Sequence, residues 1–150
     1  METDDTDKKI LAVLTSHARL SYRQIAKRLS LSVVTIMNRV KALEKSGAIR
    51  KYSAILDYSK IGYDIEAIID IRVSKGRELE VDKKLAESPY VFAVYDITGE
   101  FDATVLARFP NRKRLDYFVK KLQLMPNIER TSTKLIFNTI KEEQIGVSGL

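Results

Sequence analysis

A pattern that recurs 37 positions apart limits the fold of the last hundred residues more than any other feature. In 84–91 and again in 121–128, Lys-Leu is followed by three residues, a proline, one more residue and a β-branched residue. Each copy ends a helical apolar pattern and then enters a strand-like segment, because proline cannot continue a helix. The repeat therefore predicts two similar helix–strand halves within one domain.

Strand and helix patterns around the repeat complete this prediction. Their order, βαββαβ with right-handed crossovers, predicts a ferredoxin-like domain with an antiparallel sheet and both helices on one face. Strand residues of both faces are apolar, so we expect the uncovered face to be buried against another subunit. The expected strands cover 65–73, 91–98, 103–109 and 128–140, and the expected helices cover 77–87 and, capped by Asn111, extend to Leu124.

The first third of the chain has the pattern of three short helices. Residues 4–6 can cap the first helix, and Ser21 and Ser32 are good N-caps for the second and third. The third helix has apolar residues at i, i+4 and i+7 and ends before Gly47, a residue type that often follows a helix. A short turn between the second and third helices predicts a helix-turn-helix. The chain is therefore predicted to be α+β, with a helix-turn-helix domain at 1–49, a linker with a short strand at 50–63 and the ferredoxin-like domain at 64–150.

The excess positive charge lies in the helix-turn-helix part. Residues 1–52 have 11 Lys/Arg and 5 Asp/Glu, whereas residues 53–150 have 15 of each. From Arg19 to Lys51 there are nine basic residues and one acid, Glu44. A basic segment joined to a neutral one predicts a module that binds a polyanion, and the alternative is a solubilising surface.

The third helix has an outward face suited to a DNA major groove. At about 100° per residue, Ile36, Val40 and Leu43 point inward, and a face that includes Asn38 and Lys41 points outward. Asn can pair with adenine, apolar groups can contact the thymine methyl group, and Lys can reach guanine or phosphate. The predicted DNA-contacting residues are Ser21, Tyr22, Arg23, Ser32, Val34, Thr35, Met37, Asn38, Arg39, Lys41, Lys45, Arg50 and Lys51.

Some of these residues have equally plausible structural roles. Arg39 lies beside the inward stripe, where it can pack and hold the helix instead of contacting phosphate. Tyr22 can be a partly buried aromatic residue. Alternatively, it can contact DNA together with Ser21 and Arg23, because these residues begin the second helix, where backbone amides can bind a phosphate. Arg50 and Lys51 are expected to form a short wing against the DNA backbone.

A turn in the second half is a candidate small-molecule site. It consists of Thr98, Gly99, Glu100, Phe101 and Asp102. Gly99 permits a positive φ, exposed turn amides can bind a carboxylate, and Asp102 can accept from an ammonium group. An amino acid needs both functions close together. The alternative is an ordinary hairpin turn, since Gly and Asp are common there.

Two sets of residues resemble the Lrp/AsnC (feast/famine) transcription regulators. One is the helix-turn-helix set, and it departs from the family at Val33-Val34, where many relatives carry small polar or basic residues. The other pairs a G-x-x-D turn with an R-T-x-T segment. The resemblance implies a regulator that binds double-stranded DNA and forms dimers and then tetramers or octamers. It also implies an amino-acid effector, bound by Thr131, Ser132 and Thr133 together with the turn. The matching segments are Leu20–Ala26, Leu31-Ser32, Thr35-Ile36, Arg39-Val40, Leu43-Glu44 and Gly47–Ile49 in the first set, and Gly99–Asp102 and Arg130–Thr133 in the second.

Composition excludes several other kinds of site. There is no Cys and one His, His17, which excludes disulfides and cysteine metal sites and argues against a histidine-based triad. We therefore expect no enzyme activity, metal or cofactor. No apolar run is long enough to span a membrane and the acidic N-terminus is unlike a signal peptide, so we expect a cytoplasmic protein without a membrane partner. Two alternatives stay open: an architectural DNA-binding protein without an effector, and an enzyme similar to the sirohaem decarboxylases, which resemble these regulators in both domains.

Overall fold

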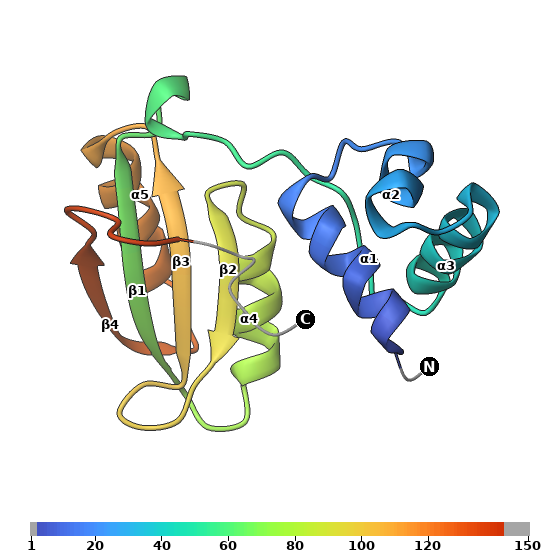
Figure 1. Cartoon of the computed structure of the whole chain (residues 1–150). Helices are drawn as coiled ribbons and strands as arrows, with labels where there is room; N and C mark the ends of the chain where they lie inside the picture. Colours follow the sequence, from blue (N-terminus) through green and yellow to red (C-terminus); the bar gives the residue numbers. More distant parts are fainter. Residues whose placement is uncertain (1–2, 143–150) are drawn as a thin grey trace. The chain divides into compact units, whose positions relative to one another are not determined.

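The computed structural model describes residues 3–142, except for the side chains of residues 78 and 79, and divides into two compact units (Figure 1). The first unit extends to Ile55, and the second covers Leu56–Ile140. Each has its own hydrophobic core, and the two cores share no residue. None of the described helices is both long and apolar enough to cross a bilayer.

The first unit is the predicted group of three helices. Helix α1 covers Asp5–Ser16, α2 covers Tyr22–Leu29 and α3 covers Val33–Lys45. The predicted caps are confirmed: the side chains of Asp4, Ser21 and Ser32 accept hydrogen bonds from backbone amides in the first turn of α1, α2 and α3. These bonds satisfy amides that have no partner within the helix, so they fix where each helix begins.

The core of this unit sets the rotation of α3. Ile36, Val40 and Leu43 are fully buried, as the helical spacing predicts, and they share a core with Ile10 of α1 and Ile25 of α2. Burial of an aliphatic side chain of this size contributes about 1.5–3 kcal/mol. The opposite side of α3 is therefore held toward solvent.

An ion-pair cluster also joins α1 to α3. The Arg39 guanidinium donates to the carboxylates of Asp4 and Asp7, with an Nη1–Oδ1 distance of 3.2 Å to Asp7. Asp7 is only 2% exposed, and a buried carboxylate without a partner is costly. Arg39 thus has the structural role that the sequence left as an alternative, and its guanidinium is already occupied.

The second unit is the predicted ferredoxin-like domain. Its sheet has the order β2-β3-β1-β4, and all neighbouring strands are antiparallel. The buried face of the sheet, which includes Ile69, Ile71 and Val105, packs with Val81 and Leu85 of α4 and with Leu115 and Phe118 of α5. Both helices therefore cover one face, as expected. The elements are β1 (Ile65–Val73), α4 (Glu78–Ala86), β2 (Val91–Asp96), β3 (Ala103–Phe109), α5 (Arg112–Gln123) and β4 (Ile128–Leu135).

Apart from shifts of one or two residues at other element ends, such as β2 ending at Asp96 and not at residue 98, two details differ from the sequence prediction. The last strand ends at Leu135 and not at Ile140, because its partner β1 begins at Ile65 and the pairing reaches its end at Ala67–Leu135. The short strand expected in 50–63 is also absent from the described chain. That segment has no strand partner there and instead forms a 3₁₀ turn, Ser59–Ile61.

The sheet face opposite the helices carries both apolar and paired charged residues. Ile68 and Leu106 are half-buried on it. Asp70 is buried, accepts from Thr104 at 2.6 Å and forms an ion pair with Lys134. Burial raises the pKa of the Asp70 carboxyl, but the hydrogen bonds from Lys134 and Thr104 outweigh it and leave this pKa below its usual value. This face of the sheet therefore combines apolar side chains with charged side chains that already have partners.

We expect the Asp4 carboxylate to make the first unit sensitive to acid. The Asp7 backbone amide and then the Arg39 guanidinium hold the pKa of Asp4 below its usual 3.8. A carboxyl with a lowered pKa in the folded state stabilises the fold above its unfolded pKa, and this stability is lost as pH falls through the folded value. The thermal midpoint, measured by circular dichroism, should therefore fall below about pH 4.

The Asp4→Asn variant separates this charge effect from helix capping, since Asn caps as well as Asp. It should show a smaller fall of the midpoint than the native chain. Asp5→Asn is the matched control, because Asp5 lies next to Asp4 and forms no ion pair with any residue in 3–142. An equal flattening in both variants would contradict the assignment to Asp4.

Candidate nucleic-acid interface and ligand site

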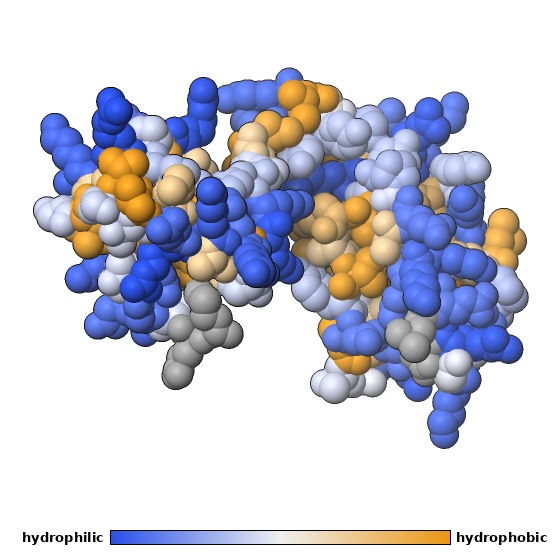
Figure 2. All heavy atoms as spheres, turned by 90° about the vertical axis from the view of Figure 1, so that its right-hand side faces the viewer, coloured by the Kyte–Doolittle hydropathy of each residue, from blue (hydrophilic) through white to orange (hydrophobic). Residues whose placement is uncertain are grey.

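The outward face of α3 is where the sequence analysis placed the DNA-reading residues. Val34 is 61% exposed, and Asn38, Lys41 and Lys45 are exposed as well. Met37 lies half-buried beside them. Figure 2 shows apolar patches on a mostly hydrophilic surface, and Val34 is one of several large apolar side chains that the described chain exposes.

Ser32 and Thr35 are engaged in capping α3. The Ser32 hydroxyl accepts from the Thr35 amide at 3.0 Å and lies 2.8 Å from the Thr35 hydroxyl. Similarly, Ser21 and Gln24 form a capping box at the start of α2. These side chains position the two helices, and their hydroxyls already have partners.

Several cations surround this face. Arg23, Lys41, Lys45, Arg50 and Lys51 are exposed, and none forms an ion pair with a residue of the described chain. Tyr22 is half-buried against the core of the unit, so its ring has the structural role considered above.

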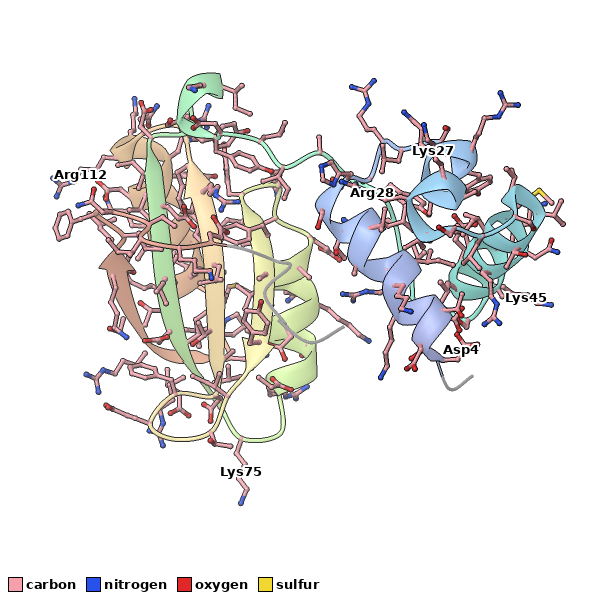
Figure 3. All side chains as sticks on the ribbon, in the orientation of Figure 1. Asp4, Lys27, Arg28, Lys45, Lys75 and Arg112 are labelled. Carbon is pink, nitrogen blue, oxygen red and sulfur yellow. The ribbon has the colours of Figure 1, made fainter. Side chains whose placement is uncertain are left out.

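Two cations that the sequence analysis passed over belong to the same unit. Lys27 and Arg28 extend from the last turn of α2 (Figure 3), and both are exposed. Arg28 also contacts the His17 ring, with 3.4 Å between Nη1 and Nδ1. Their position on the polar side of an amphipathic helix could have identified them from sequence.

The connector after α3 is fixed to that helix by Tyr52. Its hydroxyl donates to Glu44 at 3.0 Å. Burial, with this hydrogen bond to a carboxylate, raises the pKa of Tyr52 to about 12. The bond keeps Arg50 and Lys51 close to the C-terminal end of α3, in a segment that is neither helix nor strand.

The turn between β2 and β3 is bonded to the end of β1. Gly99 has φ +120°, which L-amino acids with a side chain rarely adopt. Asp102 accepts from the Val73 amide at 2.8 Å through Oδ2, and its own amide donates to the Ile71 carbonyl at 3.0 Å. The turn is therefore held against the end of β1.

Two arginines bring the turn to the start of β4. Arg130 lies 2.9 Å from the Glu100 carboxylate and has its guanidinium 5.6 Å from the centre of the Phe101 ring. Arg72, opposite Arg130 in the β1–β4 register, donates to the Glu100 carbonyl at 2.7 Å. The structure thus joins the predicted turn to the R-T-x-T segment. Arg72 was missed, although its place at the end of a predicted strand was a usable signal.

The three candidate residues of β4 are divided between the faces of the sheet. Thr131 and Thr133 pair with Ile71 and Ile69 and share their helix-covered face, and Gln123 of α5 donates to the Thr131 hydroxyl at 3.3 Å. Ser132 pairs with Asp70 on the other face. Thr98 and Glu100 are exposed. No group of three or more metal-ligating side chains occurs within residues 3–142.

Comparison with known families agrees with both units. Residues 3–50 match a winged helix-turn-helix DNA-binding family, and residues 66–145 match the Lrp/AsnC ligand binding domain. An HTH-type transcriptional regulator of Pyrococcus furiosus is 41% identical over 143 residues, covering 95% of this chain and 97% of that protein. The HTH-type transcriptional regulator FL11 of Pyrococcus horikoshii is 35% identical over 139 residues, covering 93% and 92%.

Solved structures agree with the fold. A transcriptional regulator of Neisseria meningitidis in complex with L-Met superposes with a TM-score of 0.88 at 26% identity and 96% coverage of both chains. Escherichia coli AsnC shares the fold, with a TM-score of 0.89 at 24% identity and coverage of 97% and 99%.

The sequence relatives are named as transcriptional regulators, which confirms the prediction of a regulator and not an enzyme. A family model matched over more than half of the chain, together with relatives that align along nearly all of it, shows that this protein belongs to the Lrp/AsnC family of DNA-binding transcriptional regulators and carries the ligand-binding domain of that family.

Proposed function

We propose that the protein binds specific DNA sequences by inserting the exposed face of α3 into the major groove. The observation that carries the proposal is the combination, on one helix, of a fully buried apolar stripe with an outward face of Val34, Asn38 and Lys41. Asn38 supplies an amide for adenine, Val34 an apolar contact for a thymine methyl group, and Lys41 a cation for guanine or phosphate. Arg39 stabilises the unit and does not read bases.

The proposed DNA-binding form is a dimer or a larger assembly. The sheet face opposite the helices has half-buried Ile68 and Leu106 and the exposed rings of Phe92 and Tyr95, which a second subunit can cover. Two copies of α3 in a symmetric dimer would reach major grooves about 34 Å apart and so bind a pseudo-palindromic site. Light scattering with and without ligand distinguishes dimer, tetramer and octamer.

The Asn38→Ala variant should lose base preference as well as affinity. Removing a bidentate adenine contact costs about 1–3 kcal/mol at that base pair only. Lys45→Ala is the matched comparison, since loss of a phosphate contact weakens binding to all sequences alike and lowers the salt slope by about 1.

Duplexes selected from a random pool by the native chain provide the site for these affinity measurements. An Asn38→Ala variant that selects the same sequences with the same affinity would contradict base reading by α3. A native chain that enriches no sequence while still binding DNA would favour the architectural alternative.

We further propose an amino-acid effector at the β2–β3 turn. In this turn, the positive φ of Gly99 and the absence of a side chain there leave the backbone accessible, and Asp102 supplies a carboxylate. Arg72 and Arg130 both contact Glu100 of the same turn. One Asp102 oxygen binds the Val73 amide, and a carboxylate has capacity for further donors such as an ammonium group. The L-Met complex of the Neisseria relative supports an amino acid as the ligand class.

Calorimetry against the twenty amino acids should identify an effector, and Asp102→Asn should weaken its binding about 10- to 100-fold through loss of a charged hydrogen bond. The asparagine oxygen can still accept from the Val73 amide, so the turn and the effector-free DNA affinity should be retained. Heat from no amino acid, with DNA binding intact, would contradict this site.

A further inference from the structure

Helix α5 concentrates positive charge in a region that is otherwise acidic. Its residues, Arg112–Gln123, include five Lys/Arg and one acid, Asp116. The rest of residues 53–150 has ten Lys/Arg and fourteen Asp/Glu. The net charge of residues 53–150 is therefore zero although α5 is strongly basic.

The five cations of α5 are not held by ion pairs in the described chain. Arg112, Lys113, Arg114, Lys120 and Lys121 are all exposed, and none forms an ion pair with a residue in 3–142. Arg112 extends away from the sheet into solvent in Figure 3. By contrast, Lys84 of α4 pairs with Glu80 and Arg130 pairs with Glu100.

Helical geometry arranges these cations in rows. Leu115, Phe118 and Leu122 are buried, so at about 100° per residue the crest of α5 is formed by Lys113 and Lys120. These two residues are seven positions apart, which is about 10 Å along the helix axis. Arg114 and Lys121 form a second row with the same spacing, and Tyr117, 65% exposed, lies between the rows.

The first turn of α5 is electrostatically unfavourable in the free protein. Asn111 caps the helix by accepting from the Arg114 amide at 3.0 Å, and three cations follow directly at the positive end of the helix dipole. An anion opposite this turn would offset that repulsion. The charge pattern therefore favours an anionic partner.

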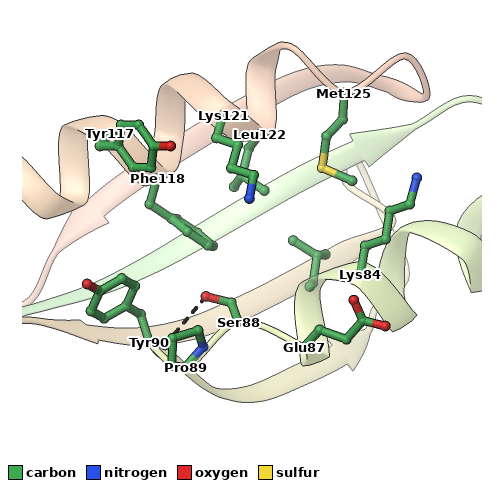
Figure 4. A pocket seen from close by; sticks show the side chains of 11 residues that line it. Lys84, Glu87, Ser88, Pro89, Tyr90, Tyr117, Phe118, Lys121, Leu122 and Met125 are labelled. Carbon is green, nitrogen blue, oxygen red and sulfur yellow. Dashed lines mark hydrogen bonds between the residues drawn. The ribbon is translucent and has the colours of Figure 1, made fainter.

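The rows are suited to an extended polyanion. A groove of about 570 Å³ separates α4 from α5, with Lys121 and Tyr117 on one side and Lys84 and Glu87 on the other (Figure 4). Lys120 lies outside this groove, and Lys113 lines, with Asn111, Arg114 and Tyr117, a second and smaller hollow of about 350 Å³ at the start of α5. A small anion in either hollow would not contact Lys120, whereas duplex DNA presents about one charge per 1.7 Å along its axis and can contact both rows.

We propose that the exposed rows of α5 form a second DNA-contacting surface, which binds phosphates beyond the site held by α3. This inference rests on the proposed DNA-binding function. Once α3 holds a duplex, DNA that continues past the site is present at high effective concentration near the same assembly. Contacts to phosphate at α5 add affinity without base preference.

The test compares two charge-matched double variants of the full chain. Lys113→Gln with Lys120→Gln neutralises the crest of α5, whereas Lys75→Gln with Lys83→Gln removes the same charge from exposed residues of the same region that lie outside α5. Binding is measured by fluorescence anisotropy on duplexes of about 20 and about 80 bp that carry the same selected site, over a range of salt concentrations.

On the long duplex, we expect the crest variant to bind about fivefold to tenfold more weakly near 0.15 M salt, with a log–log salt slope reduced by about 2. On the short duplex it should match the native chain, and the control variant should match it on both. Equal losses in the two variants, equal losses on both duplexes, or no loss on the long duplex would overturn the proposal. So would a change in assembly size alone, since α5 would then contact protein. A native chain that fails to bind the short duplex would instead refute the proposed function, and with it this inference.

Discussion

The packing of one side of α3 is the constraint on which the rest of the first unit depends. Ile36, Val40 and Leu43 are completely removed from solvent, and they cannot rotate outward without opening the core. The cluster of Arg39 with Asp4 and Asp7 fixes the same rotation from the edge of the helix. Together they hold Val34, Asn38 and Lys41 in solvent as a rigid surface, as the proposed base recognition requires.

In the second unit, strand pairing performs the equivalent task for the turn between β2 and β3. Arg72 and Arg130 are opposite one another in the β1–β4 register, and two adjacent cations need an anionic or carbonyl partner. The turn supplies both through Glu100, and Asp102 holds the turn to the end of β1. The position of the turn is thus determined by the sheet and not by the turn residues alone.

Local signals predicted most of the fold, and long-range partners account for what they missed. The capping residues Ser21 and Ser32 act within three residues, so their role was readable from sequence. The role of Arg39 depends on carboxylates more than thirty positions away, and that of Arg72 depends on a turn 28 positions away. The end of β4 likewise follows from where β1 begins, although the apolar pattern continues to Ile140.

The two hydrophobic cores have no residue in common, and this separation has a consequence for how such a chain can be altered. A substitution that disturbs the packing of one core leaves every buried contact of the other unchanged. The helix-turn-helix unit and the ligand-binding domain can therefore diverge independently, and a hybrid gene that joins the first unit to a different second domain would keep the core that orients α3.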